Sequence, residues 1–142
     1  ADHTILYRET AFREAVMDIT GGKGVDVVYD SVGKDTIHHS IRSLKRRGLC
    51  IMFGASSGQV AAIEPLELAE AGSIFFTRPH LADYTATAEE VRWRAVDLFK
   101  AVADGKLTVT IDREFPLASA RQAHELLEAR GSKGKLLLRV DY

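Results

Sequence analysis

Apolar residues recur along the chain with two different periods. Unbroken apolar runs predict strands buried on both faces, as the central strands of parallel sheets are. The predicted strands occupy residues 4–7, 25–30, 49–53, 73–77, 107–115 and 135–140. Apolar residues three or four positions apart predict amphipathic helices. The predicted helices occupy residues 12–19, 37–47, 63–71, 87–104 and 119–130.

Local signals mark the ends of these helices. Thr87 with Glu90, and Ser119 with Gln122, have the spacing of a capping box, in which two side chains satisfy each other's free backbone amides. Glycines follow most of the predicted helices and favour their termination. The basic residues 45–47 then fall in the last turn of a helix, where cations are favoured by the helix dipole.

The alternation of strands and helices predicts the fold class. A βαβαβαβ order is typical of an α/β fold with a doubly wound, mostly parallel sheet and helices on both faces. Residues 79–86 are predicted to form an exposed loop. The pattern shows no internal repeat and no linker.

Composition is that of one globular domain. The chain has 142 residues, 46% of them hydrophobic, and its net charge of -1 gives no basis for binding nucleic acid or a membrane surface. Its one cysteine, Cys50, fits a reducing compartment, so we expect a cytoplasmic protein. No apolar run reaches the roughly 20 residues that span a bilayer. The first residue is Ala1 and not Met, which suggests a fragment or a processed chain.

The segments that follow the predicted strands are candidates for a binding site. Ligands of a doubly wound sheet bind beyond the carboxyl ends of its strands. These segments, 30–33, 53–58 and 76–79, are rich in small and hydroxyl-bearing residues, and Gly33 and Gly54 allow the backbone to approach a ligand closely. The same residue types favour ordinary turns. The residues alone therefore leave a site and plain connections as open alternatives.

Other patterns lack the spacing of a functional motif. The glycine-rich residues 21–24 lie between a helix and a strand, the reverse of a phosphate-binding turn, and are predicted to stop the helix. No dinucleotide fingerprint, nucleophile elbow or metal-ligand spacing occurs in the sequence. Arg130, Lys133 and Lys135 form a positive cluster that suits either solvent or an anionic ligand such as a ribose phosphate.

Four segments together resemble a known family. They are ITGGKGVDVVYDSVGKDT (19–36), RGL leading into FGASSG (47–58), GSIFFTRP (72–79) and AHELLEARGSKGK (123–135). Each is modest alone, but together they cover essentially the whole chain. They resemble NADPH:quinone oxidoreductases, the zeta-crystallin-like group of zinc-independent medium-chain reductases.

The resemblance implies a domain and a cofactor site. Residues 1–142 would be the carboxyl-terminal part of a Rossmann-like NADPH-binding domain that lacks the first two family strands, with 107–142 returning toward a catalytic domain outside the chain. Tyr7 and Arg130 match positions at the adenosine 2′-phosphate, which favours NADPH over NADH. The implied cofactor contacts are Tyr7, Ser31, Val32, Phe53, Gly54, Ser56, Phe76, Thr77, Arg130, Gly134 and Lys135.

An activity and partners are also implied. The reaction would be hydride transfer from NADPH to a quinone or an enone, without zinc and without a catalytic side chain in this segment, which we expect to be inactive alone. Residues 73–78 would pair edge to edge in a homodimer. Because the strand Val25–Asp30 would lack its family neighbour, we expect residues 4–7 or a second chain beside it. A non-catalytic dimerisation module, or an enoyl-reductase piece of a polyketide or fatty-acid synthase, remain open alternatives.

Overall fold

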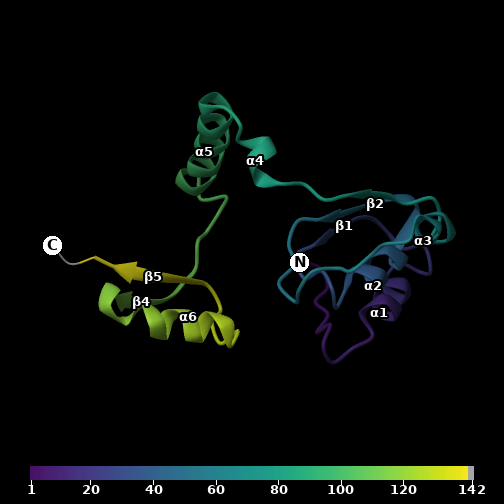
Figure 1. Ribbon diagram of the computed structural model, residues 1–142, viewed down its shortest axis with the longest axis horizontal. Helices are drawn as coiled ribbons and strands as arrows, with labels where there is room; N and C mark the ends of the chain where they lie inside the picture. The colour runs from purple at the N-terminus through teal and green to yellow at the C-terminus, as the bar shows by residue number, and fades with distance from the viewer. Residues whose placement is uncertain (141–142) are drawn as a thin grey trace. The chain divides into compact units, whose positions relative to one another are not determined.

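The computed structural model describes residues 1–140, which form two compact units divided between Tyr84 and Thr85. In chain order (Figure 1) the elements are α1 (Phe12–Ile19), β1 (Val25–Asp30), α2 (Ile37–Arg42), β2 (Leu44–Met52), α3 (Pro65–Glu70), β3 (Phe75–Thr77), α4 (Leu81–Tyr84), α5 (Ala88–Ala103), β4 (Ile111–Pro116), the short 3-10 helix η1 (Leu117–Ser119), α6 (Ala120–Glu128) and β5 (Lys135–Arg139).

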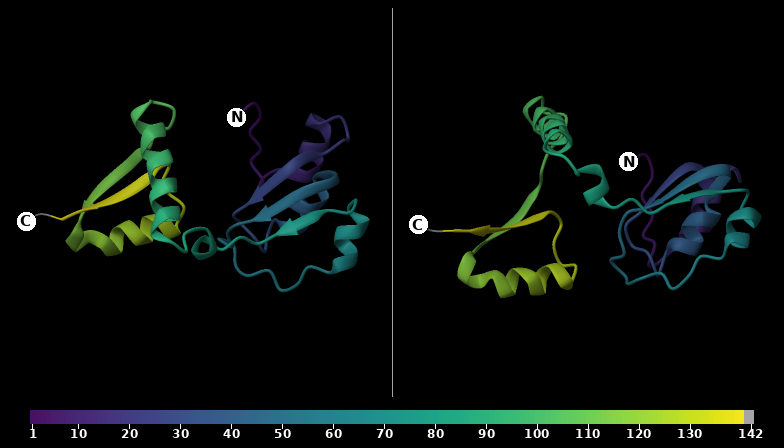
Figure 2. Two further views of the ribbon diagram at one scale, coloured as in Figure 1. Left: turned by 90° about the horizontal axis from the view of Figure 1, so that it is seen from above. Right: turned by 45° about the horizontal axis from the view of Figure 1, so that its top comes forward.

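The first unit is built on a three-stranded parallel sheet in the order β1-β2-β3. Its arrows point the same way in Figure 2, so their carboxyl ends share one edge. Across the sheet Val28 is level with Cys50, and Cys50 with Phe76. One step further, Ile51 is level with Thr77. The register therefore places the ends of all three strands within about one residue of each other.

The core of the first unit lies between this sheet and its helices. Ile37 and Ile41 of α2 and Cys50 of β2 have no exposed surface, and Val28 and Phe76 pack against them. Figure 1 shows α1 and α2 on the same side of the sheet. Within this unit the other face is open, because its large apolar side chains are exposed. These are Val27, Tyr29 and Phe75, at 40%, 71% and 63%.

The single cysteine is part of this core. Burial raises the pKa of the Cys50 thiol to about 11, and the negative charge of Asp30 adds to the effect. The thiol is therefore neutral at physiological pH and packs as a small apolar group.

The second unit contains a parallel βαβ arrangement. β4 pairs with β5, and η1 and α6 connect them. Ala123 of α6 is buried against this pair, while α5 precedes it as a separate 16-residue helix. The predicted α/β class with parallel strands is confirmed, although within residues 1–140 the strands form a three-stranded and a two-stranded sheet.

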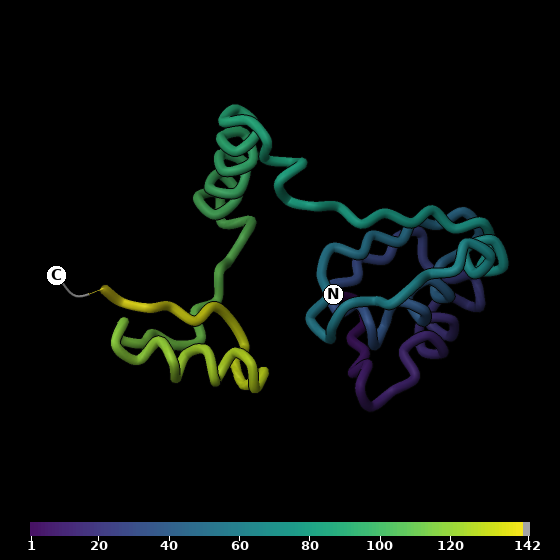
Figure 3. Tube along the Cα trace, viewed as in Figure 1, coloured from purple at the N-terminus to yellow at the C-terminus, as the bar shows by residue number. Residues whose placement is uncertain are grey.

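The predicted strand at residues 4–7 is wrong. The backbone amides of Glu9 and Thr10 both donate to the Leu6 carbonyl oxygen, at 2.8 and 3.0 Å, so the chain turns here (Figure 3). Length is not the reason, because β3 has only three residues; residues 4–7 are not a strand because no described strand pairs with them. Among the described residues β1 pairs with β2 alone, so the expected pairing of residues 4–7 with β1 is also wrong, although Tyr7 lines a pocket with Val28 and Tyr29 of that strand.

The predicted helical turn at residues 45–47 is wrong as well. These residues belong to β2, where the register slips because Leu44 pairs with Val25 and the next pair is Leu49 with Val27. Arg47 adopts a φ of 60° in this irregular stretch, and its amide donates to the Gly72 carbonyl oxygen at 2.8 Å. Helix α2 therefore ends earlier than predicted, at Arg42, because residues 45–47 form a bulge in β2.

One of the two predicted capping boxes is confirmed. Thr87 and Glu90 exchange hydrogen bonds, with the Thr87 amide donating to Glu90 Oε2 at 3.0 Å and the Glu90 amide to Thr87 Oγ1 at 3.2 Å. The box at Ser119 is wrong, because Ser119 ends η1 at φ -99° and ψ 18° and makes no capping bond. A capping side chain needs a more extended backbone.

The segment 79–86 is exposed over most of its length, as predicted, but it includes the one-turn helix α4, all of whose residues are exposed. Among residues 1–140 no helix is both long enough and apolar enough to cross a membrane.

Candidate functional site

The carboxyl edge of the three-stranded sheet gathers most of the predicted site residues. Ser31 and Val32 follow β1, and Phe53, Gly54 and Ser56 follow β2. The Phe53 amide donates to the Asp30 carbonyl oxygen at 2.9 Å, which continues the β1–β2 ladder to the ends of both strands. The turns that leave these strands therefore begin side by side.

Hydrogen bonds lock the two turns together. The Ser56 amide donates to the Ser31 carbonyl oxygen at 3.1 Å, and the Ser57 amide to that of Val32 at 2.9 Å. The Ser57 hydroxyl donates to the same Val32 oxygen at 2.7 Å and accepts from the Asp35 amide at 3.0 Å. Turns with this many mutual bonds form a fixed backbone surface.

Two glycines make this contact possible. A Cβ on Gly54 would lie 2.6 Å from the Ser31 carbonyl oxygen, a distance that no side chain can occupy. Gly33 has a φ of 84°, and a Cβ there would lie 3.1 Å from the Gly58 carbonyl oxygen. Both glycines are therefore required because the two turns pack directly against each other's backbone.

The Asp30 side chain holds the turn at residues 30–33 through hydrogen bonds. Its carboxylate is 4% exposed and accepts from the amides of Val32 at 2.8 Å and Gly33 at 2.9 Å. It also accepts from the hydroxyls of Thr36 at 2.8 Å and Ser40 at 2.7 Å. Burial alone would raise the pKa of Asp30, but the bonds from Gly33, Ser40, Thr36 and Val32 together hold that pKa below its ordinary value of 3.8. The carboxylate is charged at neutral pH.

A pocket of about 210 Å³ opens beside this turn. Three of the predicted site residues, Tyr7, Ser31 and Val32, line it, and Asp30 and Phe12 contribute to its wall. Tyr7 reaches the pocket from the turn that replaces the expected strand, where it is 37% exposed. A volume of this size holds part of a drug-sized ligand, such as one ring.

The end of β3 supplies the remaining predicted residues of this unit. Thr77 is exposed and level with Ile51, one residue before the end of β2. Phe76 is only half-buried, but its side chain packs against the core beside Cys50. A ligand at this edge can contact the exposed side chain of Thr77, whereas the side chain of Phe76 packs in the core.

Arg130, Gly134 and Lys135 lie in the second unit. Arg130 has a φ of 54° and follows α6, and its amide donates to the Leu127 carbonyl oxygen at 3.0 Å. The Lys135 amide donates to the Thr110 carbonyl oxygen at 2.8 Å, and a Cβ on Gly134 would lie 2.5 Å from that oxygen. Gly134 is thus required for the close approach of the two strand starts.

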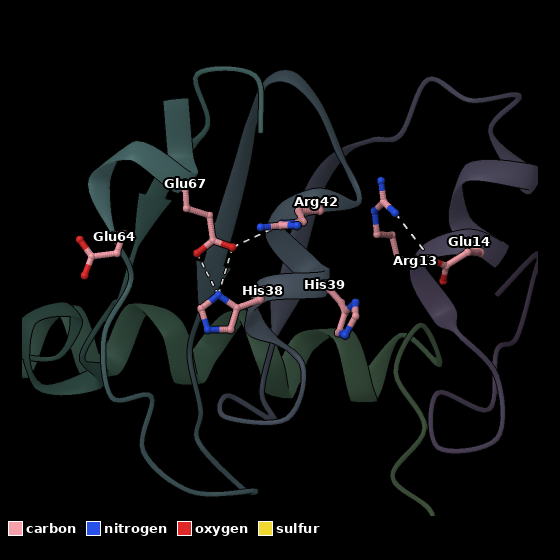
Figure 4. Close-up of a pocket in the computed structure, with 7 residues that line it drawn as sticks. All are labelled: Arg13, Glu14, His38, His39, Arg42, Glu64 and Glu67. Atoms are coloured by element: carbon pink, nitrogen blue, oxygen red, sulfur yellow. Dashed lines mark hydrogen bonds and ion pairs between the residues drawn. The ribbon is translucent and has the colours of Figure 1, made fainter. Parts of the chain in front are cut away.

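A larger pocket of about 520 Å³ lies among the helices of the first unit (Figure 4). Glu67 accepts from His38 Nδ1 at 2.8 Å and lies 3.5 Å from Arg42 Nε. His39, the residue after His38 on α2, lines the pocket too. Arg13 and Glu14 form a further ion pair in this pocket, at 3.6 Å, and ion pairs whose cation is exposed, as in these three, contribute little to stability. Within the described part of the chain, no group of three or more His, Cys, Asp or Glu residues could hold a metal ion.

Asp30 and Ser57 lie in the candidate segments 30–33 and 53–58, but neither was among the implied cofactor contacts. Asp30 was visible as an Asp before a turn, a pattern typical of a side chain that accepts from amides two residues on. The contribution of Ser57 had no local signal, because its partner Val32 is 25 residues away. Only the pairing of β1 with β2 brings the two turns together.

The fold and this edge define a class of protein. Parallel strands joined by helices, with tight turns at their carboxyl ends, form a Rossmann-like nucleotide-binding architecture. Residues 1–138 match the family model described as zinc-binding dehydrogenase. The chain belongs to this family.

Individual relatives narrow the comparison. The chain is 45% identical over 136 residues to quinone oxidoreductase 1 of Escherichia coli (strain K12), covering 94% of this chain and 42% of that protein. It is 43% identical over 137 residues to 2-haloacrylate reductase of a Burkholderia species, covering 96% and 41%. The crystal structure of an Escherichia coli quinone oxidoreductase complexed with NADPH matches at a TM-score of 0.90 and 43% identity, covering 96% and 42%. The chain thus spans about two fifths of the length of these relatives.

Proposed function

We propose that this chain forms the carboxyl-terminal part of the NADPH-binding domain of a quinone oxidoreductase, with residues 107–142 returning toward the catalytic domain. The whole polypeptide would transfer hydride from NADPH to a quinone or to the activated double bond of an enone. The observation that carries the proposal is the pair of interlocked, glycine-packed turns at 30–33 and 53–58, in a chain 45% identical to a quinone oxidoreductase.

The residues present fit a nicotinamide nucleotide. Gly54 packs against Ser31 and so fixes the turn, Ser56 is exposed on that turn, and Phe53, 53% exposed, offers an aromatic face beside it. The pocket formed with Tyr7 and Val32 has room for one portion of the dinucleotide. Further contacts are proposed for Ser31, Phe76, Thr77, Gly134 and Lys135. The structure supports backbone contact at Phe76, because its side chain packs in the core.

The proposed preference for NADPH over NADH rests on Tyr7 and Arg130. A guanidinium group presents a planar fork of donors that matches a phosphate, and a phenol adds one more donor. The hydride comes from NADPH when it is bound. The protein's part is to orient the nicotinamide ring and exclude water, so we propose no catalytic side chain within residues 1–142.

The proposal also covers the absence of zinc, the cellular compartment and the oligomeric state. We propose that this family member works without zinc; within the 142 residues of this chain the one cysteine is buried and neutral, with a pKa near 11, and so is a poor metal ligand. We place the protein in the cytoplasm, where a lone thiol stays reduced. We also propose a homodimer through residues 73–78, since β3 ends the sheet order and Phe75 is 63% exposed on it.

A direct assay tests the proposed activity. The full natural polypeptide that carries these residues should consume NADPH, followed by loss of reduced-nicotinamide absorbance, with 1,4-benzoquinone or with 2-chloroacrylate as the acceptor. NADH should be a poor substitute. The 142-residue chain alone should show weak binding of NADPH and no turnover. No consumption of NADPH with any quinone or enone acceptor would contradict the proposal, and the same rate with NADH would contradict the NADPH preference.

One observation also supports the alternative that the chain is a non-catalytic dimerisation module. The free side of β3 with its exposed Phe75 would serve a dimerisation module as well as a reductase. The two proposals separate on the assay above, because a dimerisation module would form dimers without binding NADPH.

A further inference from the structure

A buried charge without a cationic partner is costly, so its surroundings show what it is for. Asp30 is 4% exposed, and the four groups that donate to it are all uncharged. Two of them are the backbone amides of Val32 and Gly33, and two are hydroxyls on the segment that begins α2. The carboxylate therefore joins the turn after β1 to the first part of α2.

This arrangement exceeds what the turn itself needs. A simple Asp turn is completed by one bond from the side chain to an amide two residues on. Here Thr36 donates to both carboxylate oxygens, at 3.0 and 2.8 Å, and Ser40 adds a bond of 2.7 Å from the next turn of the helix. The two hydroxyls fix the rotation of the carboxylate, and the carboxylate in turn fixes the two amides.

The same turn is held from its other side. Ser57 donates both its amide and its hydroxyl to the Val32 carbonyl oxygen, at 2.9 and 2.7 Å. Val32 is thus bound through its amide to Asp30 and through its carbonyl oxygen to Ser57. The peptide groups on both sides of this residue have one orientation each, and the Val32 side chain lines the pocket beside Tyr7.

We propose that Asp30 is a positioning residue, whose carboxylate holds the 31–33 turn in the conformation that receives the nicotinamide nucleotide and so sets the affinity for it. This inference rests on the proposed function, since it assigns the turn a ligand. A group that is ordered before binding loses less conformational entropy on binding, so holding the turn strengthens affinity without any contact between Asp30 and the cofactor. A purely structural Asp30 would stabilise the fold and leave affinity unchanged.

The test compares NADPH binding and backbone exchange in the full natural polypeptide and two variants. Asp30→Asn keeps the size and shape of the side chain, but its amide nitrogen carries two N–H donors that would face the amide and hydroxyl donors around it. The variant should therefore weaken NADPH binding about tenfold or more. Hydrogen exchange at the Val32 and Gly33 amides should accelerate by a similar factor. Ile41→Ala, in the same helix and with no exposed surface, destabilises the core but touches none of these bonds, and its affinity should stay within about twofold of the wild type.

A third variant covers the case in which Asp30→Asn does not fold. Ser40→Ala removes one of the four donors and leaves the turn amides on the carboxylate. It should weaken binding by about threefold, with the same increase in exchange at Val32 and Gly33. Affinity distinguishes the two roles, because a purely structural Ser40 or Asp30 would change the unfolding free energy and leave NADPH affinity unchanged.

Each outcome decides something. Wild-type protein that does not bind NADPH would overturn the proposed function and this inference with it. If the wild type binds NADPH and Asp30→Asn binds it with an affinity within about twofold of the wild type, the inference is overturned and the proposed function stands. Ser40→Ala takes the place of Asp30→Asn in this comparison if Asp30→Asn does not fold. An equal loss of affinity in Ile41→Ala would also overturn it, because general destabilisation would then account for the effect.

Discussion

Gly54 passes so close to Ser31 that a Cβ on the glycine would lie 2.6 Å from the Ser31 carbonyl oxygen. This contact joins the turn after β2 to the turn after β1 at the edge where parallel sheets bind ligands. The backbone conformation of Gly54 is open to other residues, because its φ is not in the left-handed region. Space, and not strain, therefore requires glycine here.

Gly54→Ala should separate the two turns. The methyl group must displace backbone, which typically costs about 1–3 kcal/mol of unfolding free energy, and we expect NADPH affinity to fall about tenfold. Urea unfolding and a fluorescence titration with NADPH measure the two effects. Ala55→Ser, an exposed change in the same turn, should alter stability by less than about 0.5 kcal/mol. Unchanged affinity in Gly54→Ala would show that the cofactor does not use this junction.

Asp30 should make stability depend on acid pH. Because the hydrogen bonds from the turn outweigh burial, its pKa in the folded protein lies below 3.8. A carboxyl group with a lowered pKa adds stability that is fully present above its unfolded value and is lost as the pH falls through the folded pKa. The difference in unfolding free energy between wild type and Asp30→Asn should therefore be constant near neutral pH and shrink below about pH 4. A difference that stays constant down to about pH 2.5 would contradict this.

Much of the fold followed from local pattern, and the errors share a cause. The helix at Ala88–Ala103 was predicted together with its cap, because Thr87 and Glu90 interact within one turn. The bulge at residues 45–47 was not, because it arises where β2 slips against β1. Residues 4–7 have strand composition, but no neighbour in the described chain completes a ladder with them.

The site divides in the same way. Ser31, Val32 and Gly54 were predicted as site residues from their position after strands and from the family resemblance, and the structure brings them together at one edge of the sheet. Ser57 was included only as part of the segment 53–58 and Ser40 was not included, because their roles depend on partners that the sheet and α2 bring into reach. Residues that hold a site through distant partners carry no periodic signal of their own.

Cys50 should make stability depend on alkaline pH, with the opposite sign. Its pKa is raised from 9.0 to about 11, so the neutral thiol stabilises the fold fully below pH 9.0, and this contribution is lost as the pH rises toward 11. Two pKa units correspond to at most about 3 kcal/mol. Wild type should lose unfolding free energy over this range, and Cys50→Ala should not. The native thiol should also react with a disulfide reagent only as fast as the protein opens; rapid reaction at pH 8 would contradict the burial.

The proposed dimer can be tested at an exposed residue of β3. Phe75→Lys places a charge on the edge strand, which opposes pairing between edges, so the full polypeptide should elute as a monomer with light-scattering mass to match. Leu66→Lys, 66% exposed in α3, is the control and should leave the oligomeric state unchanged. A dimer that survives Phe75→Lys would exclude this strand as the interface.

Arg130 and Arg47 offer a matched pair for the proposed phosphate contact. Both are arginines with positive φ, 54° and 60°, in a region that costs a non-glycine residue about 1 kcal/mol. Replacing either by glycine removes this cost and one positive charge, and adds the unfolded-state entropy of glycine, so both variants should change the unfolding free energy by less than about 1 kcal/mol.

Cofactor preference should separate the two variants. Arg47 lies in the bulge of β2, while Arg130 is the residue proposed to meet the 2′-phosphate. A hydrogen bond to a charged group contributes about 1.5–3 kcal/mol, so Arg130→Gly should lower the preference for NADPH over NADH by about ten- to a hundredfold. Arg47→Gly should keep the wild-type preference, measured as the ratio of kcat/KM for the two cofactors. If both variants kept the wild-type preference for NADPH, cofactor binding would not explain why Arg130, and not glycine, stands at φ 54° after α6. If both variants lost the preference equally, general electrostatic attraction would account for it, and not a specific contact between one guanidinium group and the 2′-phosphate.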